Sequence, residues 1–396
     1  MILGIVGAPS SGKSTFFKAA TLAEVAIASY PFTTIEKNVG MAYVRVECAD
    51  KDFNVQCNPR FGYCINHTRF VPVQLIDVAG LVPDAHKGKG KGNKFLDDLR
   101  QADVLIHVVD ASGSTNEFGE QVKKLSHDPC KNIKFLDYEL DMWYLGILKK
   151  GWDKFARKIH SENLNIKKQL AEQLSGLGVN EYMVEEAIKK LKLQHDPVKW
   201  KEDELANLAA ELRRKSKPII IAANKIDIEG AEFNLHKMQK EFPDYLIIPC
   251  SGDSEVALRE AAKKGLISYL PGDAKFEITG KLNDVQKNAL YYIRKNVLGK
   301  HTSTGVQDVL DKAVFDFLKY IAVFPGGENN LADKDGKLIP DCFLVPSGTT
   351  ALDFAFRIHT DLGNKFVKAI DVKRKLAVGK DYILKHRDVI EIKTRN

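Results

Sequence analysis

The amino-acid sequence predicts an α/β protein: a doubly wound, mostly parallel sheet, with an inserted helical domain and a small C-terminal α+β domain. Short continuous apolar runs alternate with helical stretches in residues 1–127 and resume near residue 216, as expected for parallel strands covered on both faces. Between these regions, apolar residues recur at helical spacing among many charges. From about residue 314, strand-like runs surround one helix that begins with a capping box.

The elements of the main sheet follow from the apolar runs. A helix is expected at STFFKAAT, directly after the first run. In the C-terminal part, a helix is expected at 350–360 and a long loop at PGGENNLADKDG. The expected strands are 2–7, 71–80, 102–112, 217–227 and 245–254 in the main sheet, and 321–325, 342–346, 365–372 and 388–394 in the C-terminal domain.

The change of pattern along the chain also predicts domain boundaries. The insertion reads as a helical hairpin, and a helix at 283–298 leads into the last domain. The predicted division is 1–127 and 216–273 for the two parts of the main domain, 128–215 for the insertion, 274–313 for a helical connector, and 314–396 for the C-terminal domain.

Composition indicates an ordinary folded protein of the cytoplasm. Of the 396 residues, 44% are hydrophobic and 28% are charged, and no run of eighteen apolar residues or secretory signal is present. We therefore expect no membrane association. The formal charge of +7 is concentrated at the C-terminus, where residues 361–396 hold ten Lys or Arg and five Asp or Glu.

The six cysteines are scattered without a CxxC pair, so reduced thiols are expected. Cys48, Cys57 and Cys64, together with His67, supply four side chains that can bind zinc. The cysteines are separated by eight and six residues, unlike the two-residue spacing of structural zinc sites. An irregular loop is therefore the favoured interpretation, and metal binding is the alternative.

The stretch GAPSSGKST fits the pattern G-x-x-x-x-G-K-[ST] directly after a strand and at the start of a helix. Glycines let backbone amides turn toward a β-phosphate, Lys13 adds a positive charge near the β and γ oxygens, and Ser14 can bind Mg²⁺. The predicted nucleotide contacts here are Gly7, Ala8, Pro9, Ser10, Ser11, Gly12, Lys13, Ser14 and Thr15.

Two further motifs follow strands, at LIDVAG and NKID. Asp77 can reach the Mg²⁺ shell and the Gly80 amide can meet a γ-phosphate. In NKID, the Asp227 carboxylate can accept two hydrogen bonds from guanine, whereas adenine presents an acceptor at the first position. The predicted base-side residues are Asn224, Lys225, Asp227, Ser251 and Gly252.

The order of these motifs, with YPFTT, GNKFLDDLR and ALDFAFRIHTDLG, resembles the Obg-like GTPases and, within them, the YchF branch in its archaeal form. The resemblance spans essentially the whole chain. It implies a P-loop GTPase domain, a ubiquitin-like TGS domain at the C-terminus, and Thr34 as the switch threonine that binds Mg²⁺ and the γ-phosphate. The expected ligands are therefore GTP or GDP and Mg²⁺.

Two departures from the family affect the expected ligands. Relatives commonly read NVGKS, in which the Asn helps to hold a potassium ion, and Ser10 replaces it here, which argues against a K⁺ requirement. Many YchF relatives have altered base-reading motifs and accept ATP. The intact NKID predicts GTP, and ATP stays an alternative.

Leu81 stands where many GTPases have a glutamine that orients the attacking water. Leucine forms no hydrogen bond, so we predict slow intrinsic hydrolysis. Water would be positioned by His86, by His127 or by a partner protein. His107, inside an apolar strand, is expected to be a core residue, and HKGKGKGNK is expected to be a hinge, with an anion-binding surface as the alternative.

The basic C-terminal domain predicts contact with RNA. Together with the resemblance, this indicates a monomeric GTPase whose nucleotide state controls binding of its TGS and helical domains to a ribosome or rRNA. The alternatives are an ATPase and an RNA-binding scaffold that nucleotide stabilises. The basic side chains concerned are Lys365, Lys368, Lys373, Arg374, Lys375, Lys385 and Arg387.

Overall fold

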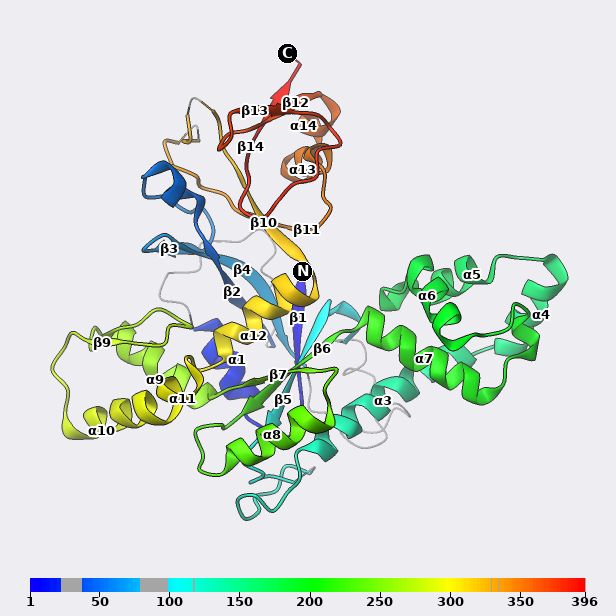
Figure 1. Cartoon of the computed structure of the whole chain (residues 1–396), viewed down its shortest axis with the longest axis horizontal. Helices are drawn as coiled ribbons and strands as arrows, with labels where there is room; N and C mark the ends of the chain where they lie inside the picture. The colour runs from blue at the N-terminus through cyan, green and yellow to red at the C-terminus, as the bar shows by residue number, and fades with distance from the viewer. Residues whose placement is uncertain (23–37, 79–98, 117, 329, 334, 396) are drawn as a thin grey trace. The chain divides into compact units, whose positions relative to one another are not determined.

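The computed structural model describes residues 1–22, 38–78, 99–116, 118–328, 330–333 and 335–395 (Figure 1). Contacts within the chain define two compact units, and each is described by itself. The first unit comprises Met1–Ala19, Lys37–Gly40 and Leu75–Val309, and the second comprises Ala20–Glu36, Met41–Gln74 and Leu310–Asn396.

The main sheet has seven strands, and its central strands β1, β5, β6 and β7 are parallel neighbours in that order (Figure 1). The full order is β2-β4-β1-β5-β6-β7, with β3 antiparallel to β4. The predicted doubly wound α/β class is confirmed, and β2 and β3 are strands that the sequence did not predict. The bounds are β1 Ile2–Val6, β2 Val39–Glu47, β3 Tyr63–Ile65, β4 Thr68–Asp77, β5 Val104–Asp110, β6 Ile219–Asn224 and β7 Leu246–Pro249.

Strands β5 and β6 are buried along their whole length, because every residue of Val104–Asp110 and of Ile219–Asn224 is shielded from solvent. Apolar side chains of β1, β5 and β6 belong to one continuous core with those of the neighbouring helices. His107 lies in β5 beside Val6 and Ile221 and is 2% exposed, so its expected core position is confirmed. Helix α1 (Lys13–Thr21) follows β1, α8 (Ala231–Glu241) follows β6, and α9 (Gly252–Lys263) follows β7.

The insertion is larger than the predicted hairpin, because it contains five α-helices. The hairpin interpretation was wrong since helical periodicity shows the buried face of each helix but not where a chain turns. Arg213, 1% exposed, joins two of these helices through ion pairs to Asp137 at 3.0 Å and Asp141 at 2.8 Å. The helices are α3 Cys130–Lys149, α4 Trp152–Glu162, α5 Ile166–Gln173, α6 Glu181–Leu191 and α7 Glu202–Ser216.

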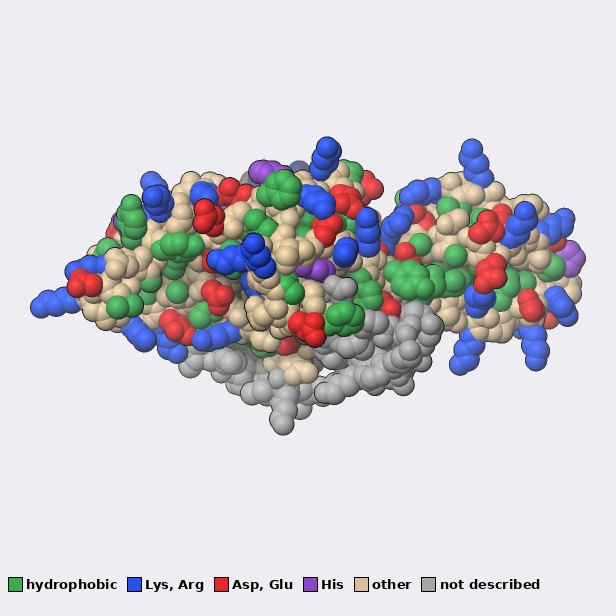
Figure 2. All heavy atoms as spheres, turned by 90° about the horizontal axis from the view of Figure 1, so that it is seen from below, with side chains coloured by type: hydrophobic (Ala, Val, Ile, Leu, Met, Phe, Trp, Pro, Cys, Tyr) green, Lys and Arg blue, Asp and Glu red, His purple; other side chains and the backbone are tan. Residues whose placement is uncertain are grey.

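Charges of both signs are interspersed over the face drawn in Figure 2. Within the insertion, Lys190 pairs with Glu211 at 2.8 Å and Lys215 pairs with Glu186 at 2.7 Å. This arrangement is typical of a solvated surface rather than of a basic patch.

The segment after α9 completes the first unit with a short β-hairpin and the predicted helix α10. Asn283 begins α10 with a capping box that includes Gln286, and the helical backbone continues through Arg294–Leu298. Its apolar face packs in a separate small core with Leu258 and Phe276. The bounds are β8 Ile267–Ser268, β9 Glu277–Ile278, α10 Asp284–Ile293, α11 Gly299–His301 and α12 Val306–Lys312, of which α12 runs into the second unit.

The second unit contains a five-stranded sheet of order β11-β10-β14-β12-β13. One helix, α13, begins at the predicted capping box of Thr350 and Asp353 and buries Phe354 against the sheet. The predicted small α+β domain is thereby confirmed, with β13 as an additional strand. The bounds are β10 Tyr320–Pro325, β11 Phe343–Pro346, α13 Ala351–Ile358, α14 Thr360–Asn364, β12 Phe366–Asp371, β13 Leu376–Val378 and β14 Val389–Thr394.

Residues 41–74 belong to this second unit, although the sequence assigned them to the first part of the main domain. Ion pairs from Arg387 to Glu47 at 2.9 Å and to Asp52 at 3.0 Å connect this segment with the C-terminal domain.

Among the described residues, none of the helices has both the length and the apolar composition that crossing a membrane requires.

Candidate nucleotide-binding site

The loop between β1 and α1 has the backbone that a phosphate-binding turn requires. Gly12 has φ 95°, and a Cβ at this position would lie 2.1 Å from Asn224 Nδ2. Gly7 has φ 149°, and its Cβ would lie 2.4 Å from the Val108 carbonyl oxygen. Ser10 adopts φ 58° and is exposed, whereas Ser11 is 2% exposed. No side chain larger than glycine fits at either glycine without moving neighbouring atoms.

Lys13 folds back over the loop that precedes it. Its Nζ donates to the carbonyl oxygens of Gly7 at 2.9 Å and Ala8 at 2.8 Å. Burial lowers the pKa of Lys13, and the nearby Asp77 carboxylate opposes that shift. A cation held by two neutral carbonyls can exchange them for phosphate oxygens and form stronger, charge-assisted bonds.

Asp77 ends β4 with a buried carboxylate oxygen, Oδ1, that has no hydrogen-bond partner within the described residues. Burial raises the pKa of Asp77, and Lys13 opposes that shift. Ser14 is exposed in the first turn of α1. A carboxylate and a hydroxyl are oxygen ligands of the kind that Mg²⁺ prefers, and a cation would satisfy the orphaned oxygen, so this donor set fits the ion.

Asn224, at the end of β6, connects the phosphate loop with the loop after β7. Its Nδ2 donates to the Ser11 carbonyl oxygen, and its Oδ1 accepts from the Gly252 N–H, both at 3.0 Å. The side chain is 3% exposed, so both bonds are shielded from water. Two predicted groups of nucleotide contacts are therefore joined by one buried amide.

Lys225 is held by Asp110, a residue that sequence reasoning did not select. Lys225 Nζ donates to Asp110 Oδ2 at 2.8 Å, and Ser112 and Thr115 also donate to this carboxylate. Burial alone would raise the pKa of Asp110, but these hydrogen bonds hold it below its ordinary value. The position of Asp110 at the carboxyl end of β5, between the other motif-bearing strands, was a signal that could have identified it.

Asp227 is fixed through both its side chain and its backbone. Ser251 Oγ donates to Asp227 Oδ1 at 2.7 Å, and Ser251 also caps α9. Tyr292 of α10 donates its hydroxyl to the Asp227 carbonyl oxygen at 2.6 Å. Sequence reasoning selected Ser251 but missed Tyr292, because nothing in a helix marks which exposed tyrosine will meet a distant loop.

The structure does not describe every predicted site residue. Thr34, Gly80, Leu81 and His86, with the stretch HKGKGKGNK, lie outside the described residues. His127 is described: it is 9% exposed, and its Nε2 lies 2.6 Å from Asn132 Oδ1. This contact connects the loop after β5 with the first turn of α3 and so stabilises the local fold.

Comparison with known families agrees with this geometry in three separate parts of the chain. Residues 2–136 match the model described as 50S ribosome-binding GTPase. Residues 222–327 match the Obg-like GTPase YGR210-like, G4 motif-containing domain, and residues 330–394 match the TGS domain.

Relatives match the chain over nearly its full length. A GTP-binding protein of Methanocaldococcus jannaschii is 49% identical over 392 residues, which are 99% of this chain and 98% of the relative. The ribosome-binding ATPase YchF of Mycoplasma pneumoniae is 33% identical over 92% of this chain and 88% of its own. The crystal structure of a GTP-binding protein from Pyrococcus horikoshii OT3 covers 100% of both chains, with 40% identity and a TM-score of 0.79. The chain therefore belongs to the Obg-like GTPases, in their YchF branch, and ends in a TGS domain.

Proposed function

We propose that this protein binds GTP with Mg²⁺ at the carboxyl edge of the main sheet and hydrolyses it slowly to GDP. The observation that supports this most strongly is the fixed position of Asp227. Ser251 occupies Oδ1 from one side, so the carboxylate can meet the N1–H and exocyclic amine of guanine without first being ordered.

The remaining residues of the site would hold the phosphates. Lys13 would leave the two loop carbonyls and bind between the β- and γ-phosphates, where negative charge develops during phosphoryl transfer. The amides of the turn from Gly7 to Ser14 would bind the β-phosphate. Mg²⁺, held by Ser14, Asp77 and Thr34, would supply charge neutralisation at the β and γ oxygens.

Slow hydrolysis follows from Leu81, which has no polar atom with which to orient water. Gly80 would offer its amide to the γ-phosphate. His86 is the preferred candidate for positioning water in this chain, since the ring of His127 is already bonded to Asn132. A partner protein that completes the site is the other candidate.

ATP hydrolysis is a second candidate function, and the name of a relative favours it. The Mycoplasma pneumoniae relative is called a ribosome-binding ATPase. ATP use requires that Asp227 does not dictate the base, because the acceptor N1 of adenine would face a carboxylate that is itself an acceptor. The two candidates therefore differ in what Asp227 does.

Competition binding separates these candidates. A fluorescent GDP derivative is displaced from the full chain by GTP, ATP or GDP in the presence of Mg²⁺. The proposal expects GTP to compete at least about 100-fold better than ATP, since one unmatched buried acceptor costs about 1–3 kcal/mol and a second hydrogen bond is also lost. Equal competition by ATP would support the second candidate.

We also propose that the nucleotide state controls binding to the ribosome or to other translation-linked RNA, as the name of the Mycoplasma pneumoniae relative suggests. Order in the loops around Thr34 and Gly80 would differ between the GTP-bound and GDP-bound protein. This difference would change how the helical insertion and the TGS domain bind the ribosome. Of the five-part division predicted from the sequence, 128–215 would be the helical part of this switch, and 314–396, together with residues 41–74, would be its TGS part.

The exposed lysines of the TGS domain are the preferred RNA contacts. Lys373 and Arg387 are paired with Asp52, and Arg374 pairs with Asp371, so these three are partly neutralised. Of the seven basic side chains predicted to contact RNA, Lys365, Lys368, Lys375 and Lys385 are exposed and form no ion pair with a carboxylate within the described residues.

Charge-removing variants test the RNA proposal better than deletion of the domain, because residues 41–74 and 310–396 form one unit. A variant with Lys365→Gln, Lys368→Gln and Lys385→Gln should bind ribosomes more weakly and with a smaller salt dependence. The matched control replaces Lys275, Lys281 and Lys295, exposed lysines of the segment after α9, in the same way. Unchanged affinity of the first variant would refute the proposed surface.

A further inference from the structure

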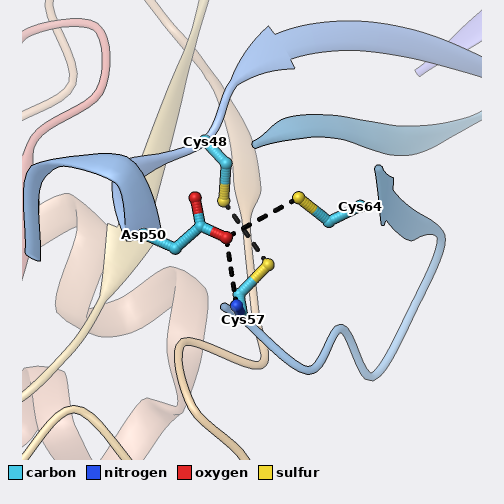
Figure 3. Close-up of side chains that lie close together, drawn as sticks. All are labelled: Cys48, Asp50, Cys57 and Cys64. Atoms are coloured by element: carbon cyan, nitrogen blue, oxygen red, sulfur yellow. Dashed lines mark hydrogen bonds between the residues drawn. The ribbon is translucent and has the colours of Figure 1, made fainter. Parts of the chain in front are cut away.

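Three cysteines separated by eight and six residues in the sequence meet in the second unit (Figure 3). Cys48 follows β2 and begins the 3₁₀ helix Ala49–Phe53, Cys57 follows that helix, and Cys64 lies in β3. Asp50 lies among them. One ligand atom from each of these four residues lies within 4.8 Å of all the others. The loop between β2 and β3 is therefore organised around a cluster of sulfur and oxygen atoms.

Two of the spacings among these atoms are close to the edges of a metal tetrahedron. Zn–S bonds of about 2.3 Å and Zn–O bonds of about 2.0 Å place tetrahedral ligands roughly 3.5–3.8 Å apart. The Sγ atoms of Cys48 and Cys57 are 3.5 Å apart, and Cys64 Sγ lies 3.7 Å from Asp50 Oδ2. Both distances fall in or close to this range.

Burial also favours a closed site. Cys48 and Asp50 are 0% exposed, Cys57 is 4% exposed and Cys64 is half-buried, so three of the four ligand residues are withdrawn from water. A carboxylate in such a position needs a cation or several donors. Asp50 Oδ2 accepts from the Cys57 N–H at 3.0 Å, which orients the carboxylate toward the sulfurs.

We propose that Cys48, Asp50, Cys57 and Cys64 bind one structural Zn²⁺ ion. Four protein ligands leave no open coordination position, so the ion would hold the fold rather than catalyse a reaction. Three thiolates favour a soft or borderline metal over Mg²⁺ or Ca²⁺. The proposed site lies entirely in the second unit and does not depend on the proposed GTPase function.

His67 would act through Asp50 rather than on the metal. Its Nδ1 lies 2.9 Å from Asp50 Oδ1, the carboxylate oxygen that does not face Cys64. An imidazole N–H bonded to a metal-binding carboxylate fixes its orientation. Cys64 and His67 are separated by two residues, the spacing of structural zinc sites, which the sequence interpretation of this group overlooked.

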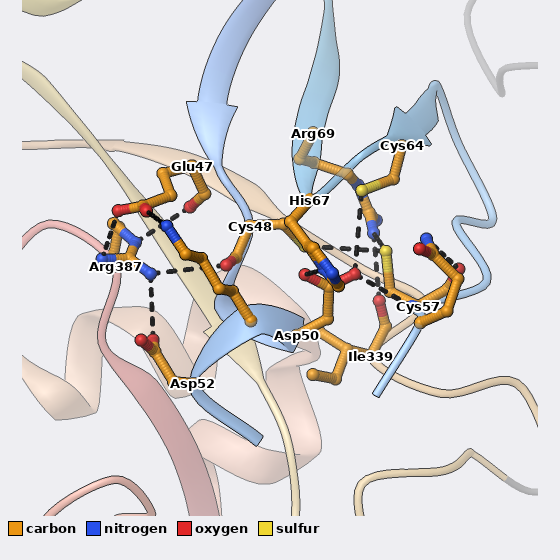
Figure 4. Close-up of polar contacts among 12 residues, drawn as sticks. Glu47, Cys48, Asp50, Asp52, Cys57, Cys64, His67, Arg69, Ile339 and Arg387 are labelled. Atoms are coloured by element: carbon orange, nitrogen blue, oxygen red, sulfur yellow. Dashed lines mark hydrogen bonds and ion pairs between the residues drawn. The ribbon is translucent and has the colours of Figure 1, made fainter. Parts of the chain in front are cut away.

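Arg69 supplies a second, independent indication of negative charge at the cluster (Figure 4). The guanidinium is 1% exposed and donates to Cys57 Sγ at 3.4 Å and to the backbone oxygens of Ile339 and Pro340. The ion pairs of the described residues include none between Arg69 and a carboxylate, and Asp341, which lies near enough to interact with its charge, pairs with Arg60 at 3.3 Å. Three thiolates and one carboxylate on a dication leave a net negative charge, which a buried arginine would balance.

The test is metal analysis of the full chain, made without a metal-affinity tag and with thiols kept reduced. Mass spectrometry of the elements should find one zinc per chain, and replacement by Co²⁺ should give thiolate charge-transfer and tetrahedral d–d bands. Cys57→Ser should lose the metal or bind it at least tenfold more weakly. Cys130→Ser, a buried thiol of the first unit, is the matched control and should retain one equivalent.

Two further measurements keep the proposal falsifiable where a ligand variant fails to fold. In the wild-type chain, a thiol reagent should release zinc in step with modification of Cys48, Cys57 and Cys64. His67→Gln should weaken zinc binding about tenfold while the cobalt spectrum keeps its three-thiolate character.

Absence of zinc after purification and after reconstitution with ZnCl₂ would overturn the proposal. A Cys48–Cys57 disulfide in freshly purified protein that resists metal loading would also overturn it. GTP binding measured on the same samples separates this result from failure of the proposed function, because every described residue of the nucleotide site lies in the first unit.

Discussion

Asn224 and Ser11, 213 positions apart in the chain, are joined by a buried hydrogen bond of 3.0 Å from the side-chain amide to the backbone carbonyl. The same amide accepts from Gly252. The phosphate loop and the base-side loop are thus positioned by one residue, so the spacing between phosphate and base contacts is built into the folded protein before nucleotide binds.

Replacing Asn224 with Ala should weaken both stability and GTP affinity. The substitution leaves the Ser11 carbonyl and the Gly252 N–H without partners, at a cost of about 1–3 kcal/mol. Asn234→Ala is the control, since this buried amide of α8 bonds only to the Ala111 carbonyl among the recorded contacts. Thermal unfolding and calorimetric titration with GTP should show stability lost in both variants and affinity lost in Asn224→Ala alone.

Lys13→Met should lower GTP affinity roughly 10- to 100-fold, because a charge-assisted bond to phosphate contributes about 1.5–3 kcal/mol. Lys217→Met is the control variant, because Lys217 resembles Lys13 in burial and in its hydrogen bonds. Lys217 is also a lysine whose pKa burial lowers, and it donates to two carbonyl oxygens, those of Arg100 and Ala102. Equal loss of affinity in both variants would mean that Lys13 acts only through stability.

Asp227→Asn should change the base that the protein prefers. An amide donates where the carboxylate accepted, so it matches the 2-oxo group of xanthine and no longer matches the exocyclic amine of guanine. XTP should therefore bind the variant at least about tenfold better than GTP does. The exposed Asp244, changed to Asn, should leave GTP preferred; a preference for GTP in Asp227→Asn as well would remove Asp227 from base recognition.

His107 should make the protein less stable in mild acid. Burial, with a smaller contribution from Lys13, lowers the pKa of His107 to about 3 in the folded protein, against about 6.5 when unfolded. The unfolded chain therefore binds a proton that the native state does not, and stability falls as pH drops from about 6.5 toward 3, by up to about 1.4 kcal/mol per pH unit.

Thermal unfolding at pH 7 and pH 5 measures this effect. His107→Leu should show a smaller drop in the melting midpoint between the two values than the wild-type chain. The exposed His195, replaced in the same way, is the control and should melt as the wild type does. An unchanged drop in His107→Leu would show that other groups govern the acid response.

The sequence predicted the parts of this fold whose signals are local. The phosphate loop follows β1 because glycines are required at positions 7 and 12, and α13 begins where Thr350 can cap it. Contacts between distant segments could not be predicted in this way. The pairing of Asp110 with Lys225 depends on the order of strands in the sheet, which no single stretch encodes.

The cysteine cluster is a second feature that the sequence did not predict. Gaps of eight and six residues suggested an irregular loop, but the 3₁₀ helix Ala49–Phe53 and the β3–β4 pairing bring the three sulfurs together. Spacing along the chain predicts a metal site only where a short turn connects the ligands. In this protein the cysteines are brought together by a 3₁₀ helix and a strand pair that the sequence analysis did not predict.

Isothermal titration of the full, folded chain with GTP and GDP in the presence of Mg²⁺ tests the central claim most directly. The account predicts saturable binding of one guanine nucleotide per chain, weakened by removal of Mg²⁺ in the case of GTP and by Lys13→Met but not by Lys217→Met. Absence of binding heat for either nucleotide, confirmed by an equilibrium method at several temperatures, would contradict it.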